Sequence, residues 1–162
     1  MSAGDNNESV IYSAIQEKLQ GSGIDLSSVA IVSDSAFSAE ERIVDTLDEY
    51  TVLPDIIVCL SDINTRCAYR YIVDKNYVGY ISFIGYYDSD TVLEGIDRGA
   101  IDATFSVDTT QVARYCVDAL NEYIDSSYVS MYFSTDYVLI DRYNVSGYIE
   151  ERRSQEASDE ED

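Results

Sequence analysis

Polar side chains follow three short apolar segments of the sequence, and these residues are the best suited to bind another molecule. Ser61 and Asp62 follow DIIVCL, Tyr87 and Asp88 follow ISFIGY, and Asp108 follows IDATFSV. A carboxylate accepts paired hydrogen bonds from neighbouring hydroxyl groups, and a Tyr ring packs on the apolar face of another ring. These five residues therefore predict a site for a small polyhydroxylated or cationic solute.

The same positions have a purely structural interpretation. An Asp or Ser directly after a strand accepts a hydrogen bond from the first free amides of the following helix. Asp62, Asp88 and Asp108 each precede a segment with helical spacing. Helix capping and solute binding are compatible, so the spacing leaves both interpretations open.

Residue types missing from the chain argue against an enzyme. The sequence contains no His, so no Ser-His or Cys-His nucleophile and no histidine metal site can form. The segment around Gly85 lacks the glycine spacing and the Lys of a phosphate-binding loop. No acidic spacing of the EF-hand kind is present. We therefore expect a binding protein without catalytic residues, metal or cofactor.

The charge of the chain argues against binding to nucleic acids or to membrane surfaces. Asp and Glu number 31 against 10 Lys and Arg, which gives a formal net charge of -21. Such a chain is repelled by nucleic acids and by anionic membrane surfaces. The acidity is explained by solubility, by a saline habitat or by a specific basic partner. Cys59, Cys67 and Cys116 form no CxxC pair and are predicted to be buried free thiols rather than redox or metal groups.

Helical and strand-like segments alternate along the chain with short connections. Helical spacing is found at 9–19, 38–50, 89–98 and 109–124, and strand-like runs at 28–33, 55–60, 78–86, 101–107, 129–134 and 137–141. A further helix is expected after Ser61 and Asp62, with an apolar face of Cys67, Ala68, Tyr71 and Ile72. A capping box of Ser38 and Glu41 is expected to begin the second helix. This alternation predicts an α/β fold, doubly wound, with a mainly parallel sheet and helices on both faces. The carboxyl ends of its strands would then bring the five candidate residues to one edge.

The two ends of the chain differ in composition from the rest. Residues 1–7 and 150–162 carry few apolar side chains, and both are predicted to be disordered around a single lobe at 8–149. The N-terminus has neither the basic nor the apolar region of a signal peptide. No apolar run approaches the length that crosses a membrane, so we expect no membrane insertion.

Four linked segments between about Glu8 and Tyr148 give the chain a family resemblance. They are PDIIVCLSD (54–62), FIGYYDSDTVLEGIDRGAIDATFSVD (83–108), QVARYCVDALNEYI (111–124) and YVLIDRYNVSGY (137–148). In this order and at these distances, they resemble the second half of the type 1 periplasmic solute-binding proteins and of the related lactose-repressor-type regulators. Many sugar binders of the family have Gln where this chain has Val107, and an Arg near Glu8 or Ser9 that is absent here.

The resemblance implies a periplasmic-binding-protein-like lobe, with hinge-region strands near 101–108 and 129–145. It makes Ser61, Asp62 and Asp88 candidate ligand contacts, with Tyr87 as a stacking neighbour. It implies binding of a sugar-like solute, as one lobe of a bacterial protein that serves a transporter or sensor. The lobe's partner would be a missing N-terminal lobe or a second copy of the chain. The location would be extracytoplasmic within a longer precursor, or cytoplasmic if the chain is complete as written. The alternatives are the effector-binding domain of a cytosolic regulator and an interaction domain without ligand.

Overall fold

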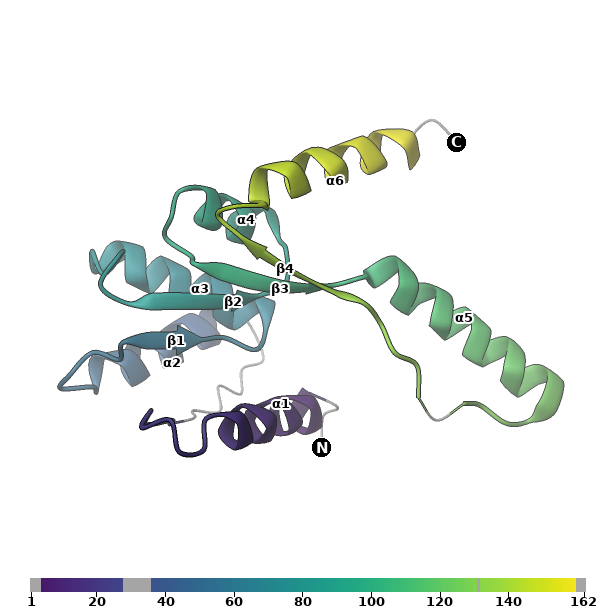
Figure 1. Cartoon of the computed structure of the whole chain (residues 1–162), viewed down its shortest axis with the longest axis horizontal. Coiled ribbons are helices and arrows are strands. Elements are labelled where there is room, and N and C mark those ends of the chain that lie inside the picture. The colour runs from purple at the N-terminus through teal and green to yellow at the C-terminus, as the bar shows by residue number, and fades with distance from the viewer. Residues whose placement is uncertain (1–3, 28–35, 131, 160–162) are drawn as a thin grey trace.

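A computed structural model of the chain describes residues 4–27, 36–130 and 132–159. Helices and strands alternate through most of this part of the chain (Figure 1). In chain order, the elements are α1 (Gly4–Lys18), α2 (Ala36–Asp48), β1 (Ile56–Val58), α3 (Asp62–Asp74), β2 (Ser82–Tyr86), α4 (Asp90–Asp97), β3 (Ala103–Val107), α5 (Thr109–Ser126), β4 (Tyr137–Asp141) and α6 (Val145–Asp159).

The described strands form one mixed sheet in the order β1-β2-β3-β4. β1, β2 and β3 are parallel, with Val58 beside Ile84 and Tyr86 beside Phe105. β4 runs antiparallel to β3, with Val107 beside Tyr137. Parallel neighbours require crossover connections, which α3 and α4 provide. Because the crossovers are right-handed and the strand order advances in one direction, both helices lie on the same face of the sheet.

The core lies between that face and its helices. Phe83 of β2, Thr104 of β3 and Ile140 of β4 are fully buried there. The apolar stripe of α3, which includes Ala68 and Ile72, packs in the same core as the stripe of α4. Burying one such large side chain stabilises the fold by about 1.5–3 kcal/mol. The buried apolar residues are Ala39, Ile43, Cys59, Cys67, Ala68, Tyr71, Ile72, Phe83, Val92, Leu93, Ile96, Ile101, Ile140 and Val145.

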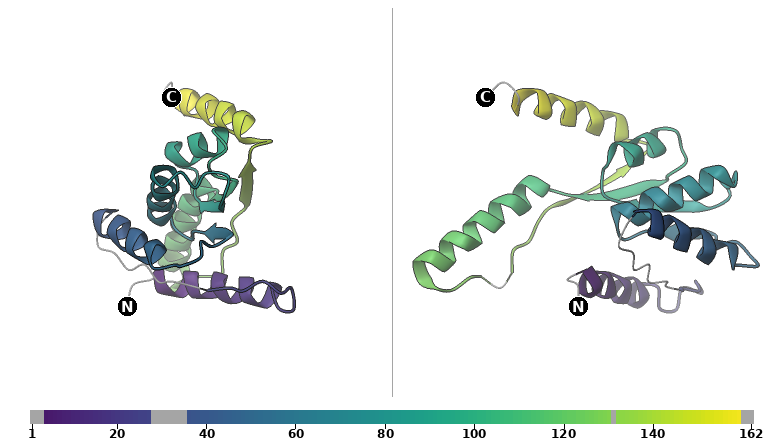
Figure 2. Two further views of the ribbon diagram at one scale, coloured as in Figure 1. Left: turned by 90° about the vertical axis from the view of Figure 1, so that its left-hand side faces the viewer. Right: turned by 180° about the vertical axis from the view of Figure 1, so that it is seen from behind.

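The opposite face of the sheet is exposed in the described part of the chain. Ile56, Phe105 and Leu139 point to that side and remain accessible. The predicted α/β fold with a mainly parallel sheet is thus confirmed, and the described helices that pack on the sheet do so on one face (Figure 2). The run 28–33, expected to be a strand, lies outside the described residues.

α5 and the segment that returns from it form an arm that extends away from the sheet (Figure 1). α5 begins two residues after the end of β3, and β4 begins at the end of the return segment. No residue of α5 is buried. The expected inward positions of this helix therefore do not pack against this lobe, and Cys116 is exposed rather than buried as predicted.

Two further elements differ from the sequence-based expectation. The described residues of 129–134, predicted to be a strand, form no strand, and Ser130 within them donates to the Glu122 carboxylate of α5 instead of to a neighbouring strand. α2 begins at Ala36, so Ser38 lies inside the helix instead of capping it.

The two ends of the chain also contain helix where composition predicts disorder. α1 begins at Gly4, inside 1–7, and α6 extends through Asp159, inside 150–162. The Glu and Arg residues of α6 favour helix even without a continuous apolar stripe. Disorder predicted from low hydrophobicity does not take this intrinsic preference into account.

Candidate functional site

The loop after β1 carries Ser61 and Asp62 at the start of α3. Ser61 is the N-cap of this helix, and its Oγ accepts a hydrogen bond of 3.3 Å from the backbone N–H of Asn64. One carboxylate oxygen of Asp62 accepts a hydrogen bond of 2.9 Å from Nε of Arg66. Both residues are half-buried. Helix capping is therefore the local role of Ser61, and it fixes where Asp62 lies.

Thr65, one turn into α3, fastens this loop to β2. Its Oγ1 donates to the carbonyl of Ser61 at 2.8 Å and accepts from the backbone N–H of Tyr86 at 2.9 Å. The side chain is fully buried and lies so close to β2 that a Cβ on Gly85 would come within 2.6 Å of its Cγ2. Glycine at position 85 thus allows the close approach of helix and strand. The sequence contained no specific signal for Thr65 beyond its place on the inner helix face.

The loop after β2 carries Tyr87 in a conformation that is uncommon for a residue with a side chain. Its φ is 75°, in the left-handed region that favours glycine. Its N–H donates to the carbonyl of Phe105 at 2.7 Å, and its own carbonyl accepts from Oγ1 of Thr104 at 2.7 Å. Both bonds tie Tyr87 to β3, and they hold the backbone in this turn.

Asp88 is held by α6, an element that the sequence did not predict. Oη of Tyr148 donates to the Asp88 carboxylate at 2.5 Å. Arg152 donates to the Asp88 carbonyl at 2.7 Å and lies 3.4 Å from the carboxylate of Asp90. Burial raises the pKa of Tyr148, the hydrogen bond to Asp88 raises it further, and its contact with Ser106 opposes the shift. The Tyr148 hydroxyl therefore remains protonated and acts as a donor.

A hydrogen bond joins the two loops. Oγ of Ser89 donates to the second carboxylate oxygen of Asp62 at 2.9 Å. The structure thus brings Ser61 and Asp62 next to the loop that contains Tyr87 and Asp88, at the carboxyl edge of β1 and β2. Each Asp in this cluster has partners from the protein itself, so a solute would have to share or replace them.

Asp108 has a separate local role. It is the N-cap of α5, and its carboxylate accepts a hydrogen bond of 2.8 Å from the N–H of Gln111. The side chain is exposed, and no hydrogen bond in the described part of the chain connects it with Asp62 or Asp88. Of the five candidate residues, Asp108 is the one that the structure does not bring into the cluster.

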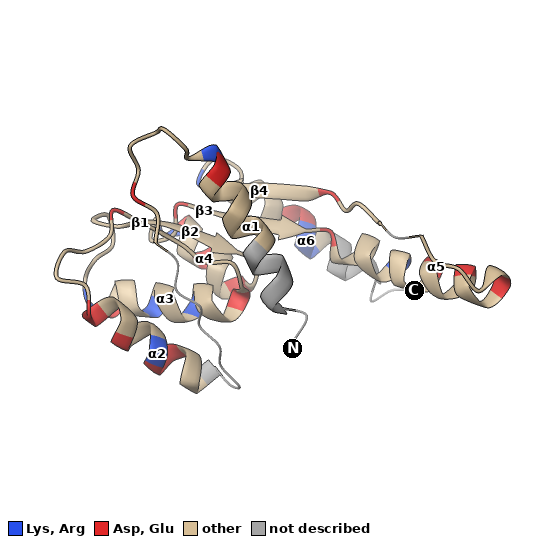
Figure 3. Cartoon of the chain, turned by 90° about the horizontal axis from the view of Figure 1, so that it is seen from below, with Lys and Arg blue, Asp and Glu red and all other residues tan. Residues whose placement is uncertain are grey.

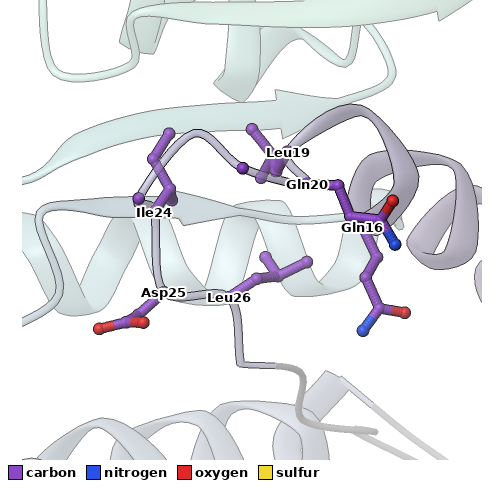
Figure 4. Close-up of a pocket in the computed structure, with 8 residues that line it drawn as sticks. Gln16, Leu19, Gln20, Ile24, Asp25 and Leu26 are labelled. Atoms are coloured by element: carbon purple, nitrogen blue, oxygen red, sulfur yellow. The ribbon is translucent and has the colours of Figure 1, made fainter.

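The residues that the structure describes contain no other obvious site. They include no group of three or more His, Cys, Asp or Glu that could hold a metal ion. The hollow in Figure 4 is lined by residues between Gln16 and Leu26, at the end of α1, and by none of the candidate residues. Cys59 is buried, and this burial raises the pKa of its thiol to about 12, so it is unreactive at neutral pH. No described helix is long and apolar enough to pass through a bilayer.

No family model matches the chain, and no curated protein matches its sequence. Solved structures do match. An ABC transporter solute-binding protein from Agrobacterium vitis bound with α-D-tagatopyranose has a TM-score of 0.69 at 13% identity, over 80% of this chain and 43% of that one. A second, from the same organism with bound D-fucose, has a TM-score of 0.60 at 20% identity, over 68% and 38%. The XylFII-LytSN complex gives 0.57 at 20% identity, over 68% and 38%.

The chain has the fold of a type 1 periplasmic-binding-protein lobe. The predicted resemblance is confirmed at this level, and the two transporter neighbours are solute-binding proteins rather than enzymes. The chain spans less than half the length of each of these three neighbours. The periplasmic-binding-protein-like lobe therefore positions the loops after β1 and β2 at the edge where open α/β sheets bind ligands.

Proposed function

We propose that the chain is one lobe of a solute-binding protein and contacts a small polyhydroxylated solute through the loops after β1 and β2. The observation that carries this proposal is the joining of those loops by the Ser89–Asp62 hydrogen bond of 2.9 Å. It brings the loop with half-buried Asp62 next to the loop with half-buried Asp88, at the carboxyl ends of parallel strands, and this arrangement supports a solute contact there. Tyr87, the residue before Asp88 in the chain, would supply an aromatic ring for the apolar face of a sugar.

The similar solved structures support a role in solute transport or sensing. Two of them are ABC transporter solute-binding proteins with bound sugars, and a third is a complex of XylFII with LytSN. We infer that the lobe works outside the cytoplasm as part of a longer precursor, beside a second lobe, and delivers its solute to a transporter or sensor. Asp62 and Asp88 would accept hydrogen bonds from hydroxyl groups of the solute. At Asp88, a solute hydroxyl would replace the Tyr148 hydroxyl as the donor.

Titration calorimetry with D-tagatose and D-fucose tests the proposal. One lobe offers about half of the contacts of a closed two-lobed site, so we expect dissociation constants on the order of 1 mM or weaker. Asp62→Asn and Asp88→Asn should each weaken binding by about tenfold, because a hydrogen bond to a charged group contributes about 1.5–3 kcal/mol. Asp97→Asn, on the exposed side of α4, is the matched control and should bind as the unaltered chain does.

Equal binding by Asp62→Asn, Asp88→Asn and the unaltered chain would place the solute elsewhere. No heat with either sugar would direct the search to other solutes, for which tyrosine fluorescence is a suitable signal. The chain has 15 Tyr and no Trp, so a solute that packs on Tyr87 changes the emission of a tyrosine-only protein.

A further inference from the structure

The carboxylate of Asp88 is already occupied by α6, the last helix of the described chain. Oη of Tyr148 donates to Oδ2 of Asp88 at 2.5 Å. A second bond from α6 lies beside it, from Arg152 to the backbone carbonyl of Asp88 at 2.7 Å. Tyr148 and Arg152 are both half-buried. The helix therefore covers part of the proposed solute site.

The Tyr148 hydroxyl offers Asp88 the same kind of bond that a solute hydroxyl would offer. A phenol and a sugar hydroxyl are both neutral groups that donate one hydrogen bond. A carboxylate accepts through two oxygens, and a solute with neighbouring hydroxyls would use both. Tyr148 occupies one of them, so a solute that binds in this way must displace the Tyr148 hydroxyl.

The structure provides a second partner for a displaced Tyr148 hydroxyl. This hydroxyl also contacts Ser106 of β3, whose side chain is buried. Tyr148 can keep that partner when it leaves Asp88, so its hydroxyl would not be buried without a hydrogen bond. Val145, one turn earlier on α6, is 1% exposed and holds the start of the helix in the core independently of Asp88. Release of Asp88 therefore does not require α6 to leave the lobe.

We propose that α6 makes an autoinhibitory contact with the solute site, in which the Tyr148 hydroxyl holds the place of one solute hydroxyl on Asp88. The inference rests on the proposed function, since it requires that Asp88 contacts the solute. The solute-free chain then divides between a closed form, with Tyr148 on Asp88, and an open form that binds. Because the binding-competent form is only a fraction of the chain, the apparent affinity is reduced by that fraction.

The Tyr148–Asp88 bond would exist only in the solute-free chain, so its removal should have opposite effects on stability and affinity. Tyr148→Phe should destabilise the solute-free chain and tighten sugar binding by about tenfold or more, as expected for a hydrogen bond to a charged group. Both effects come from one bond, so the free energy of unfolding that is lost should equal the binding free energy that is gained. Well above the dissociation constant, the variant and the unaltered chain should then be equally stable.

Titration calorimetry with D-tagatose and D-fucose, together with urea unfolding in the presence and absence of each sugar, tests the proposal. Tyr148→Phe is compared with Tyr143→Phe, which makes the same change at an 88% exposed position just before α6. Tyr143→Phe should alter neither affinity nor stability. Circular dichroism that matches the unaltered chain shows that each variant is folded.

Asp88→Asn, measured with and without Tyr148→Phe, tests whether Tyr148 and the solute compete for the same carboxylate. In the unaltered chain, Asp88→Asn weakens the competing Tyr148 bond as well as the bonds to the solute. It should therefore weaken binding by a larger factor in the Tyr148→Phe chain. Equal factors in the two chains would show that no such competition exists and would overturn the proposal.

The remaining outcomes separate this inference from the proposed function. Unchanged affinity in Tyr148→Phe, with lower stability both with and without sugar, would make Tyr148 purely structural and overturn the inference. Weaker binding would also overturn it, because Tyr148 would then position Asp88 for the solute. In both cases, a loss of affinity in Asp62→Asn would leave the proposed function standing.

Binding by Tyr148→Phe where the unaltered chain shows none would support the inference, since only removal of the competitor opens the site. No heat from either sugar with the Tyr148→Phe chain would overturn it for these sugars. Binding that Asp62→Asn and Asp88→Asn leave unchanged in both chains would overturn the proposed function, and the inference with it.

Discussion

Thr65 and Gly85 form the contact on which the candidate cluster depends. The buried Thr65 hydroxyl bonds to backbone groups of Ser61, in the loop after β1, and of Tyr86, at the end of β2. The missing Cβ of Gly85 is what lets α3 come close enough for these bonds. The cluster is therefore positioned by two residues that cannot themselves contact a solute.

Gly85→Ala should destabilise the fold by about 1–3 kcal/mol, because its Cβ would overpack against Thr65 at 2.6 Å. Gly147→Ala is the control, since no atom lies within 4 Å of its Cβ position. Within α6, that change should stabilise the protein by about 0.5–1 kcal/mol. Denaturant unfolding of both variants measures the two effects. A Gly85→Ala protein as stable as the unaltered chain would show that α3 can move away from β2 without cost.

Asp48 gives the fold a specific dependence on pH. A hydrogen bond from Lys75, followed by one from Tyr71, holds the pKa of this carboxyl below its ordinary value of 3.8. A carboxyl whose pKa is lowered by folding stabilises the protein above its unfolded pKa, and this contribution is lost as the pH falls through the folded pKa. Asp48→Asn should thus lower the unfolding midpoint near neutral pH.

The difference between Asp48→Asn and the unaltered chain should shrink as the pH falls below about 3.8, because the unfolded carboxyl becomes protonated there before the folded one does. Chemical unfolding from neutral pH to about pH 3 measures it. Asp97→Asn, with no described ion pair, is the control. A difference that persists unchanged into acid would mean that Asp48 acts through packing rather than through its charge.

At the scale of elements, α6 connects the end of the chain to the loop after β2. Its contacts with that loop come from Tyr148 and Arg152, in the first half of the helix. Arg152→Ala should lower the free energy of unfolding by about 1 kcal/mol, since it removes a hydrogen bond to Asp88 and an ion pair with Asp90. Arg153→Ala, at an exposed position next to it, should have little effect.

Deleting 155–162 should leave the melting temperature unchanged, because this segment begins after Arg152. Deleting 150–162 should lower it by as much as Arg152→Ala does. Thermal unfolding of both truncated chains, followed by circular dichroism, makes the comparison. Equal losses from the two deletions would place the stabilising contacts of α6 in its last residues instead.

At the scale of the whole molecule, unbalanced negative charge opposes folding. Acidic residues occur on α2, α3, α5 and several loops, and basic residues are fewer (Figure 3). The described ion pairs are at least partly exposed, and pairs of this kind contribute about 0–1 kcal/mol each. Repulsion among the excess carboxylates should therefore outweigh the attraction within these ion pairs. This repulsion is stronger in the compact folded state, where the carboxylates lie closer together, and so it lowers the stability of the fold.

Added salt should accordingly raise the melting temperature. Calorimetry at several protein concentrations measures this and separates it from any contribution of association. NaCl and KCl at equal ionic strength should act alike, because screening does not depend on the identity of the cation. A melting temperature that falls with salt would mean that the ion pairs contribute more than the repulsion costs.

The sequence by itself determined the kinds and order of most elements. Apolar periodicity marked α3, α4 and α5, and the run at 137–141 coincides with β4. Such patterns are local, since they reflect spacing within one turn or one strand and the preference of Ser61 and Asp108 for capping positions. The confirmed α/β fold follows from them because alternating helices and strands have few ways to form a parallel sheet.

The tertiary structure alone decided which residues meet. Local spacing could not show that Tyr148 and Arg152 hold Asp88, since they lie 60 and 64 positions after Asp88 in the chain. Nor could it show that the return segment covers the polar side of α5 and leaves Val117, Leu120 and Ile124 in solvent. An apolar stripe specifies that a helix face will be buried, whereas its partner depends on where the sheet directs the helix.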